Sequence, residues 1–351
     1  MAPALVLLLA HASAAEVLKL DRFGTNQWHL HREDARHAHQ SLPPQLALIK
    51  VCQDAVCRPV PPFWLAVPTM SSVTHYGYPG GNVQSTLHNR GLWDATETQV
   101  AAYVLGHHCK ASGAPGGALM VDVGANTGYF SALALASGCR VHAFDGEAVH
   151  GPYWAATSQL SGRANAITFH HNLVSDNATM MQFNSWSLVQ TKAGAAGNVA
   201  VQAVRLDEQI HEDVLYLKVD VEGHEPAAFR GMERLLDNHV VHVIVWEHSA
   251  HQYVTSDRRS KPPAELLKAR GYWISPLGWG GMGNYVAIHP KADTTLRARL
   301  QAMKPVSRKT KTPKGPREGR SKGARSGKRA SKASGPPVRS WLGDIVERIG
   351  R

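Results

Sequence analysis

The stretch from residue 119 to residue 131 constrains the fold of this chain more than any other. It reads Leu-Met-Val-Asp-Val-Gly-Ala-Asn-Thr-Gly-Tyr-Phe-Ser. An apolar run with β-branched residues ends at Val123, small residues fill positions 124–128, and helix formers resume at Tyr129. This order predicts a strand, a tight turn and a helix. In α/β sheets, a unit of this kind is where a nucleotide-like ligand binds.

The predicted turn differs from a dinucleotide-binding turn at two positions. Asn126 and Tyr129 stand where the dinucleotide pattern has glycines, which let the backbone approach a pyrophosphate and let the helix pack closely. The turn therefore suits a ligand without a pyrophosphate. Polar groups of that ligand would lie against Gly124, Ala125 and the free N–H groups that open the helix. S-adenosylmethionine is such a ligand.

A carboxylate occurs at the spacing expected for a ribose-binding residue. Residues 140–145 predict the next strand, which ends at Asp145, 21 residues after Gly124. In doubly wound sheets, an acid about 20 residues after the first glycine accepts hydrogen bonds from ribose hydroxyls. The turn and this acid together favour a ligand site over an ordinary tight turn.

Strand-like and helix-like segments alternate along the middle of the chain. We expect strands at residues 119–123, 140–145, 167–173, 214–221 and 240–247, and helices at residues 94–106, 129–137, 152–160, 226–236 and 263–269. Hairpins are expected within residues 179–206 and through residues 278–283. The alternation predicts an α/β fold with a doubly wound, mostly parallel sheet. Right-handed crossovers would place four strand-end carboxylates along one rim: Asp122, Asp145, Asp220 and Glu247.

A second informative segment is the central strand that ends near Asp220. Lys218, Asp220 and Glu222 alternate along it, so period-2 geometry sends all three to one side. Unpaired charge in a covered strand is costly, so this pattern is not a solvated face. Glu225 precedes Pro226, which favours a helix start whose dipole stabilises an anion. Lys218 is open to two interpretations, an internal ion pair or a site residue; Asp220 is interpreted as a site residue.

Together these motifs resemble the FkbM family of S-adenosylmethionine-dependent methyltransferases. The resemblance covers about residues 91–290 and is carried by Asp122-Val-Gly124-Ala-Asn126-Thr-Gly128-Tyr-Phe-Ser, Ala143-Phe144-Asp145, Leu206-Asp207, Leu217-Lys218-Val-Asp220-Val-Glu222-Gly223-His-Glu225 and Phe229-Arg-Gly231. It implies a seven-stranded, Rossmann-like class I methyltransferase fold, with S-adenosyl-L-methionine as cofactor and a hydroxyl oxygen as methyl acceptor. By position, the implied cofactor-binding residues are Asp122, Gly124, Asn126, Gly128 and Asp145. The family usually has Glu-Pro where this chain has Asp145-Gly146, so the following loop is expected to differ in shape.

Three acids are candidates for the methyl-transfer chemistry. An alcohol is a poor nucleophile unless its proton is accepted, either by a carboxylate or through a divalent ion. Asp220 is the first candidate for the base or acceptor-positioning residue, and Glu222 and Glu225 are second; Glu247 with His248 could complete the rim. Oxygen ligands here suit Mg²⁺ and suit hydrogen bonding equally well, so no residue is assigned to a metal. A hydroxyl of a small molecule or glycan is the acceptor that the resemblance implies.

The formal net charge of +11 is concentrated at one end of the chain. Residues 304–339 hold 13 Lys or Arg and one acid, which leaves a charge of about −1 elsewhere. We expect this segment to be disordered and to bind anionic polymers without sequence preference. Residues 341–351 predict a short amphipathic helix that could dock on the domain, on a partner or on a membrane surface. The alternative function is therefore a catalytically silent fold that binds RNA or an acidic polymer through its tail.

The remaining segments divide the chain and leave its compartment open. Residues 1–15 resemble a secretory signal, residues 16–90 are expected to form an accessory segment, residues 91–290 the methyltransferase domain and residues 291–340 the basic disordered tail. A secretory protein is expected if the signal is real, and a cytoplasmic or nuclear one otherwise. Cys52 and Cys57 could form a disulfide or half of a zinc site, although no second pair follows at a zinc spacing.

Overall fold

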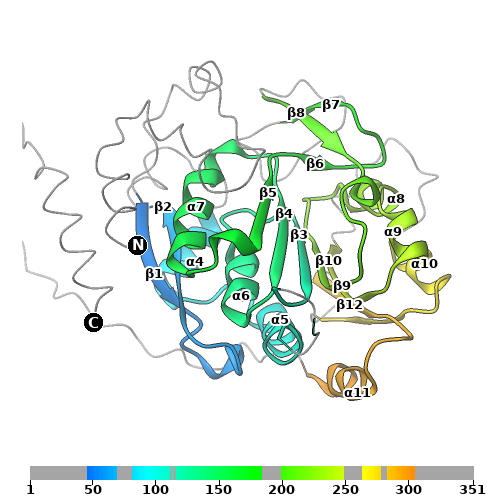
Figure 1. Cartoon of the computed structure of the whole chain (residues 1–351), viewed down its shortest axis with the longest axis horizontal. Helices are drawn as coiled ribbons and strands as arrows, with labels where there is room; N and C mark the ends of the chain where they lie inside the picture. Colours follow the sequence, from blue (N-terminus) through cyan, green and yellow to red (C-terminus); the bar gives the residue numbers. More distant parts are fainter. Residues whose placement is uncertain are drawn as a thin grey trace, which may run out of the picture.

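The computed structural model describes residues 46–68, 81–110, 113, 116–183, 199–248, 263–277 and 283–304. Its main feature is a seven-stranded sheet with the strand order β11-β12-β10-β9-β3-β4-β5 (Figure 1). The strands are β3 (Leu119–Val123), β4 (Arg140–Phe144), β5 (Ile167–His170), β9 (Val214–Val219), β10 (Val241–His248), β11 (Trp273–Pro276) and β12 (Gly283–Ile288). Strands β3, β4, β5, β9 and β10 are parallel, and only β12 runs antiparallel to its neighbours β10 and β11. This confirms the predicted doubly wound, mostly parallel, Rossmann-like sheet.

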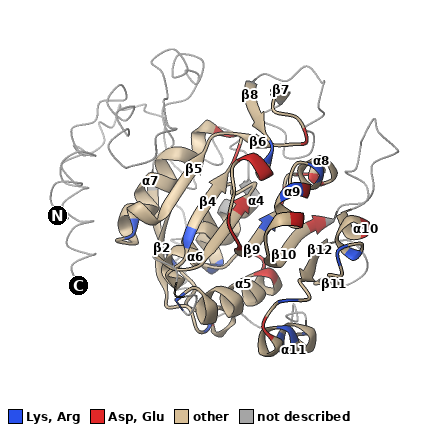
Figure 2. Cartoon of the chain, turned by 45° about the vertical axis from the view of Figure 1, so that its right-hand side comes forward, with Lys and Arg blue, Asp and Glu red and all other residues tan. Residues whose placement is uncertain are grey.

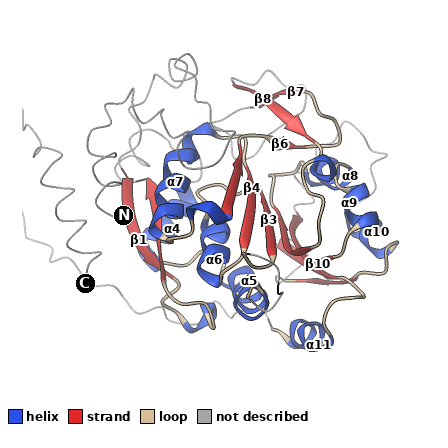
Figure 3. Ribbon diagram, in the orientation of Figure 1, coloured by secondary structure: helices blue, strands red, loops and turns tan. Residues whose placement is uncertain are grey.

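Helices cover both faces of this sheet, and the buried strands alternate between two cores (Figure 3). Met120 and Tyr216 face the core shared with α5 (Ala95–His108), α6 (Tyr129–Ser137) and α7 (Gly151–Leu160). Val121 and Leu217, the next residues along the same strands, face the core shared with α8 (Glu225–Arg230), α9 (Glu233–Asn238) and α10 (Pro263–Lys268). Strands covered on both faces are expected to be mostly apolar; β3 and β9 fit this apart from the buried charged residues Asp122 and Lys218.

A small antiparallel pair of strands precedes the main sheet. β1 (Leu46–Val51) pairs with β2 (Phe63–Pro68), and β2 packs on α6 and α7. The helix α4 (Gly81–Arg90) that follows was not expected, because its sequence is polar and has no apolar stripe.

Two disulfides tie the described part of the chain together. Cys52 bonds to Cys57 beside β1, which decides between the disulfide and the zinc alternatives for this pair. Cys109 bonds to Cys139 and so links the end of α5 to the start of β4. Disulfides are typical of oxidising compartments.

Three elements differ from the predicted pattern. The strand expected at 167–173 divides into β5 and β6 (Leu173–Val174), because β6 leaves the main sheet to pair with β8 (Val199–Val204). The hairpin partner β7 (Met180–Phe183) pairs antiparallel with β8, as expected for residues 179–206. The helix expected at 226–236 divides into α8 and α9 at Gly231, where a side chain would collide with the Ser175 carbonyl.

The range 291–340 was expected to be disordered, and its first part is helical. Asp293 caps the helix α11 (Thr294–Ala302) by accepting a hydrogen bond from the Leu296 N–H. Leu296 and Leu300 are buried against the main core, so this segment belongs to the folded domain. The predictions for residues 1–45 and 305–351 lie outside the described residues.

Charges of both signs are spread over the described elements (Figure 2). This matches the near-neutral charge expected once the basic tail is set aside. Among the described helices, none combines the length and the apolarity needed to cross a membrane.

Candidate active site

The turn after β3 is held by its own backbone. Gly124, Asn126 and Gly128 have positive φ angles of 79°, 51° and 81°, as a left-handed turn requires. A side chain at Gly124 would collide with the Asp220 carbonyl, so glycine lets the ends of β3 and β9 approach. This close approach places the two sequence motifs side by side.

The N–H groups of residues 124–127 already donate hydrogen bonds within the protein. Gly124 and Ala125 both donate to the Phe144 carbonyl, at 2.9 and 3.1 Å. The Asn126 N–H donates to Oδ2 of Asp145 at 2.6 Å. Thr127 donates to the Asn126 side chain at 2.7 Å. The turn therefore shapes the site, and a ligand would meet its surface rather than its amide donors.

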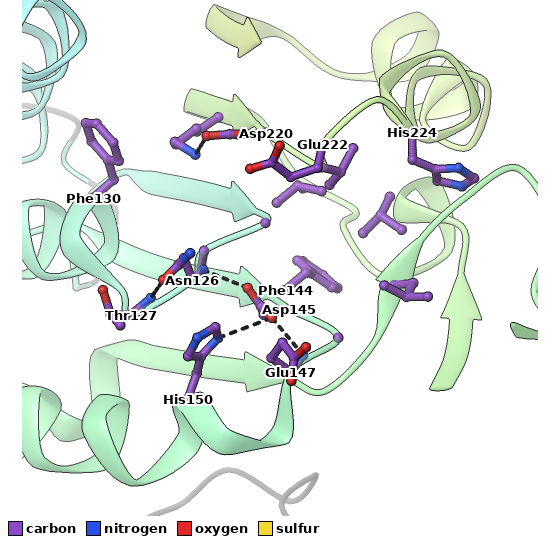
Figure 4. A pocket seen from close by; sticks show the side chains of 18 of the residues that line it. Asn126, Thr127, Phe130, Phe144, Asp145, Glu147, His150, Asp220, Glu222 and His224 are labelled. Carbon is purple, nitrogen blue, oxygen red and sulfur yellow. Dashed lines mark hydrogen bonds and ion pairs between the residues drawn. The ribbon is translucent and has the colours of Figure 1, made fainter. Parts of the chain in front are cut away.

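Asp145, directly after β4, is the anchor of this end of the site (Figure 4). Its Oδ2 accepts from Asn126, and its Oδ1 accepts from the Glu147 N–H at 2.7 Å and lies 3.3 Å from Nδ1 of His150. Burial alone would raise the pKa of Asp145. The charge and hydrogen bond of His150, with the two backbone donors, outweigh burial and hold that pKa below its ordinary value.

A cavity runs from Asp145 across the turn to the end of β9. It lies at the carboxyl ends of three neighbouring strands, with β3 between β4 on one side and β9 on the other. Ligands in open α/β sheets usually bind at this position. Its polar lining includes Asn126, Thr127, Asp145, Glu147, His150, Lys218, Asp220, Glu222 and His224, and its apolar lining includes Val83, Trp93, Phe130, Leu173, Val174 and Met181.

The structure distributes the predicted cofactor residues unevenly around this cavity. Gly124, Asn126 and Asp145 line it. Asp122 is fully buried, is not among the lining residues and accepts a hydrogen bond from Ser131 Oγ at 2.6 Å. Gly128 is likewise not among the lining residues and lies against the Trp154 indole. Asp122 therefore does not share the cavity rim predicted for it, because its side chain turns inward toward α6.

Asp220 and Lys218 form the other end of the cavity. Nζ of Lys218 lies 3.0 Å from Oδ2 of Asp220, and both residues line the cavity. Lys218 is thus both an ion-pair partner and a cavity-lining residue, so the ion pair does not exclude a role for Lys218 at the site. Burial works against the lysine charge, but the neighbouring carboxylates, Asp220 foremost, raise its pKa.

The two second-choice acids lie in different environments. Glu222 lines the cavity from a left-handed backbone position, with φ of 53°. Glu225 is fully buried, and its Oε1 accepts the N–H groups of Val221 and Gly223 at 3.0 and 3.2 Å. Burial raises the pKa of Glu225 to about 7, although these backbone donors oppose the shift. Glu225 is not among the lining residues, so its direct role is to hold the loop after β9.

Glu247 lies beside Asp220, since the neighbouring residues Trp246 and Val219 pair across β10 and β9. Burial, followed by the charges of Asp220 and the nearby acids, raises the pKa of Glu247. Of the four predicted rim carboxylates, Asp145 and Asp220 line the cavity, whereas Asp122 and Glu247, near the ends of β3 and β10, are not among its lining residues. The His248 side chain lies outside the described part of the structure.

Several site residues were not found from the sequence. Glu97 is buried near Lys218, and its Oε2 accepts from the Asn284 side chain at 2.7 Å. His150 contacts Asp145, and Trp154 Nε1 donates to the Asn126 carbonyl at 2.7 Å. A polar residue in the first turn of an apolar helix was the only available signal for Glu97. The partners of His150 and Trp154 depend on how α7 packs, which no local pattern reveals.

The sheet order, the glycine turn without dinucleotide glycines and the acid after β4 define a protein of the Rossmann-like methyltransferase class. Residues 122–272 match the family model described as the methyltransferase FkbM domain. This part of the chain belongs to that family of methyltransferases. The matched range contains the turn, Asp145 and the run from Lys218 to Glu225.

Comparison with solved structures gives distant neighbours. The methyltransferase FkbM of Methylobacillus flagellatus is 15% identical, with a TM-score of 0.37, and the alignment covers 62% of this chain and 60% of that chain. An O-methyltransferase of Bacillus cereus, in complex with SAH, is 10% identical with a TM-score of 0.36, covering 64% and 92%. A precorrin-6y C5,15-methyltransferase of Geobacter metallireducens is 15% identical with a TM-score of 0.30, covering 54% and 89%. No curated protein matches the sequence.

Proposed function

We propose that this protein binds S-adenosyl-L-methionine and transfers its methyl group to a hydroxyl oxygen of a small molecule or sugar. One observation carries the proposal. A single cavity joins a carboxylate suited to ribose, Asp145, to a carboxylate suited to the acceptor, Asp220, across the glycine turn. These are the two ends that an elongated methyl donor and its acceptor must occupy together.

The residues present suit the adenosyl end of such a cofactor. Asp145 is fixed by backbone donors, so its carboxylate is preorganised to accept further hydrogen bonds from ribose hydroxyls. The Thr127 hydroxyl is buried, has no hydrogen-bond partner within the described ranges and belongs to a lining residue, which leaves it available to a ligand group. Phe144 and Val174 provide apolar lining at the same end for an aromatic base.

At the other end, the chain would orient the acceptor and take its proton. The bound cofactor supplies a methyl group on a positively charged sulfur, and transfer leaves the neutral thioether. Asp220 would accept the hydroxyl proton as the acceptor oxygen forms its bond to carbon. Lys218, 3.0 Å from Asp220, would hold that carboxylate in place. Methyl transfer depends chiefly on such near-attack positioning.

A glycan or other polyhydroxy acceptor is favoured by the disulfides of this chain. Both Cys pairs are bonded, and disulfides persist in oxidising compartments. The exposed Asn177 of an Asn-Ala-Thr sequence is also in keeping with passage through a secretory route. The secretory alternative is therefore preferred over a cytoplasmic or nuclear location.

Calorimetric titration tests the proposal. S-adenosylmethionine and S-adenosylhomocysteine are titrated into the full chain and into Asp145→Ala and Glu265→Gln variants. Glu265 is exposed on α10, so its variant serves as the matched surface control. We expect micromolar binding that only Asp145→Ala loses. A panel of sugars and other hydroxyl compounds would then be screened for release of S-adenosylhomocysteine.

Absence of binding to both compounds would overturn the proposed function. The alternative, a binding module for RNA or an acidic polymer through residues 304–351, would then be tested by titration with heparin and with an unstructured RNA. Loss of that binding at increased salt would indicate contact with the polymer charge rather than with a sequence.

A further inference from the structure

Three carboxylates from separate elements converge beside the acceptor end of the cavity. Asp220 follows β9, Glu225 begins α8 and Glu247 lies in β10. One oxygen from each lies within 4.8 Å of the others. An ion about 2.0 to 2.6 Å from each oxygen fits among atoms this far apart.

Two oxygens of this cluster are buried without a hydrogen-bond partner among the described residues. Glu225 is fully buried and uses Oε1 for the loop amides, whereas its Oε2 has no partner. Oε2 of Glu247 is also buried and unpartnered. A buried charged oxygen without a partner is costly, and native proteins normally satisfy such atoms. These two oxygens therefore indicate a ligand that the described part of the chain does not supply.

The charge balance indicates that the missing ligand is a cation. Glu247 experiences the like charges of Asp220, Glu222 and Glu225, opposed by the ammonium of Lys218. That ammonium is already paired with Oδ2 of Asp220. A sulfonium in the cavity would not meet the unpartnered oxygens, because neither Glu225 nor Glu247 is among the described lining residues.

We propose that Asp220, Glu225 and Glu247 bind a divalent cation that prefers oxygen ligands, such as Mg²⁺ or Mn²⁺. Carboxylates without nitrogen or sulfur donors select hard cations of this kind. Asp220 both lines the cavity and belongs to the cluster, so the ion would lie where an acceptor oxygen can complete its coordination. That role in acceptor binding rests on the proposed function, whereas binding of the ion does not.

The test is a titration of the chelator-treated full chain with Mn²⁺ in the absence of cofactor. Electron paramagnetic resonance measures the concentration of free Mn²⁺ at each step. We expect one Mn²⁺ per chain, displaced by Mg²⁺, and affinity at least tenfold weaker in Glu247→Gln and Asp220→Asn. Glu225→Gln is the most conservative of the variants, because its amide oxygen can still accept the Val221 and Gly223 N–H groups. It should fold normally and still weaken Mn²⁺ binding.

Glu147→Gln is the matched control, since Glu147 is a partly buried acid at the opposite end of the same cavity. Its Mn²⁺ affinity should equal that of the wild type. Absence of Mn²⁺ binding at millimolar concentration would overturn the proposal, as would affinity that the three cluster variants leave unchanged. Titration of S-adenosylhomocysteine in EDTA separates the two proposals: cofactor binding without Mn²⁺ binding rejects the ion site alone, and the reverse result rejects the cofactor site alone.

Discussion

The carboxylates at the two ends of the cavity differ in how far the protein supplies them with hydrogen-bond partners. Asp145 receives two backbone N–H groups and a histidine, and its pKa is lowered. Beside the other end, Glu225 and Glu247 each keep a buried oxygen without a partner among the described residues, and their pKa values are raised. A carboxylate that the protein satisfies is preorganised for its ligand, whereas an unsatisfied cluster requires a ligand or a proton. We therefore expect changes at the first end to alter cofactor affinity and changes at the second to alter turnover.

The largest effect is expected from Asp220→Asn. The amide cannot accept the acceptor proton and weakens the contact with Lys218, so kcat should fall about a thousandfold. The affinity for S-adenosylhomocysteine should change by less than about threefold, because Asp220 lies at the acceptor end. Steady-state kinetics with an acceptor from the hydroxyl screen, beside calorimetry, measures both quantities. Unchanged kcat would remove Asp220 from the chemistry.

Asp145→Ala should show the converse pattern. It removes the acceptor of the Asn126 and Glu147 N–H groups, so the turn loses its shape and two buried donors lose their partner. We expect affinity for S-adenosylhomocysteine to fall about a hundredfold, or ~2.7 kcal/mol. Asp145→Asn, which retains one accepting oxygen, should fall between this variant and the wild type in calorimetry. Equal affinity for all three proteins would mean that the cofactor does not bind at this end.

A smaller effect is expected from Trp154→Phe. The indole donates to the Asn126 carbonyl at 2.7 Å, and its ring packs edge-on against Phe169. Phenylalanine keeps an aromatic ring there and removes the donor, a change of about 1 kcal/mol or fivefold in S-adenosylhomocysteine affinity. Calorimetry should show this change in Kd, while kcat at saturating cofactor stays close to wild type. A change in kcat alone would contradict the separation of the two ends.

Local patterns were sufficient for the parts of the molecule that depend on neighbours in sequence. The glycine turn, the acid after β4 and the Lys218–Asp220 pair each follow from residue spacing, and the structure places them together. The same reasoning predicted the helix at 94–106, which the structure shows as α5. Asp94 accepts from the Glu97 N–H at 3.0 Å.

Longer-range contacts decided what the sequence could not predict. The Glu97 carboxylate bonds Asn284, 187 positions away. Similarly, the approach of Glu225 to Glu247 depends on α8 packing beside β10, and the inward turn of Asp122 depends on Ser131 of α6. Residue spacing identified these acids but could not show which of them would share one pocket.

Glu147 is an exception to this contrast between the two ends of the cavity. It lines the satisfied end of the cavity, yet burial, with a contribution from the charge of Asp145, raises its pKa to about 9 from an ordinary value of 4.5. Between these pH values the folded chain holds a proton on Glu147 that the unfolded chain has released. The free energy of unfolding contributed by this group therefore falls as pH rises from about 4.5 to about 9.

Glu147→Gln removes this titration, so its unfolding midpoint should fall less steeply than that of the wild type across the same pH range. Thermal unfolding without cofactor or metal, at pH 5, 7 and 9 by design, measures the difference, with Glu265→Gln as control. Parallel curves for all three proteins would show that Glu147 ionises as it would in water. The contrast in carboxylate pKa between the two ends of the cavity would then rest on Asp145 at one end and on the cluster of Asp220, Glu225 and Glu247 beside the other. A flatter curve for Glu147→Gln would instead show that burial raises the proton affinity of a carboxylate at this end of the cavity as well.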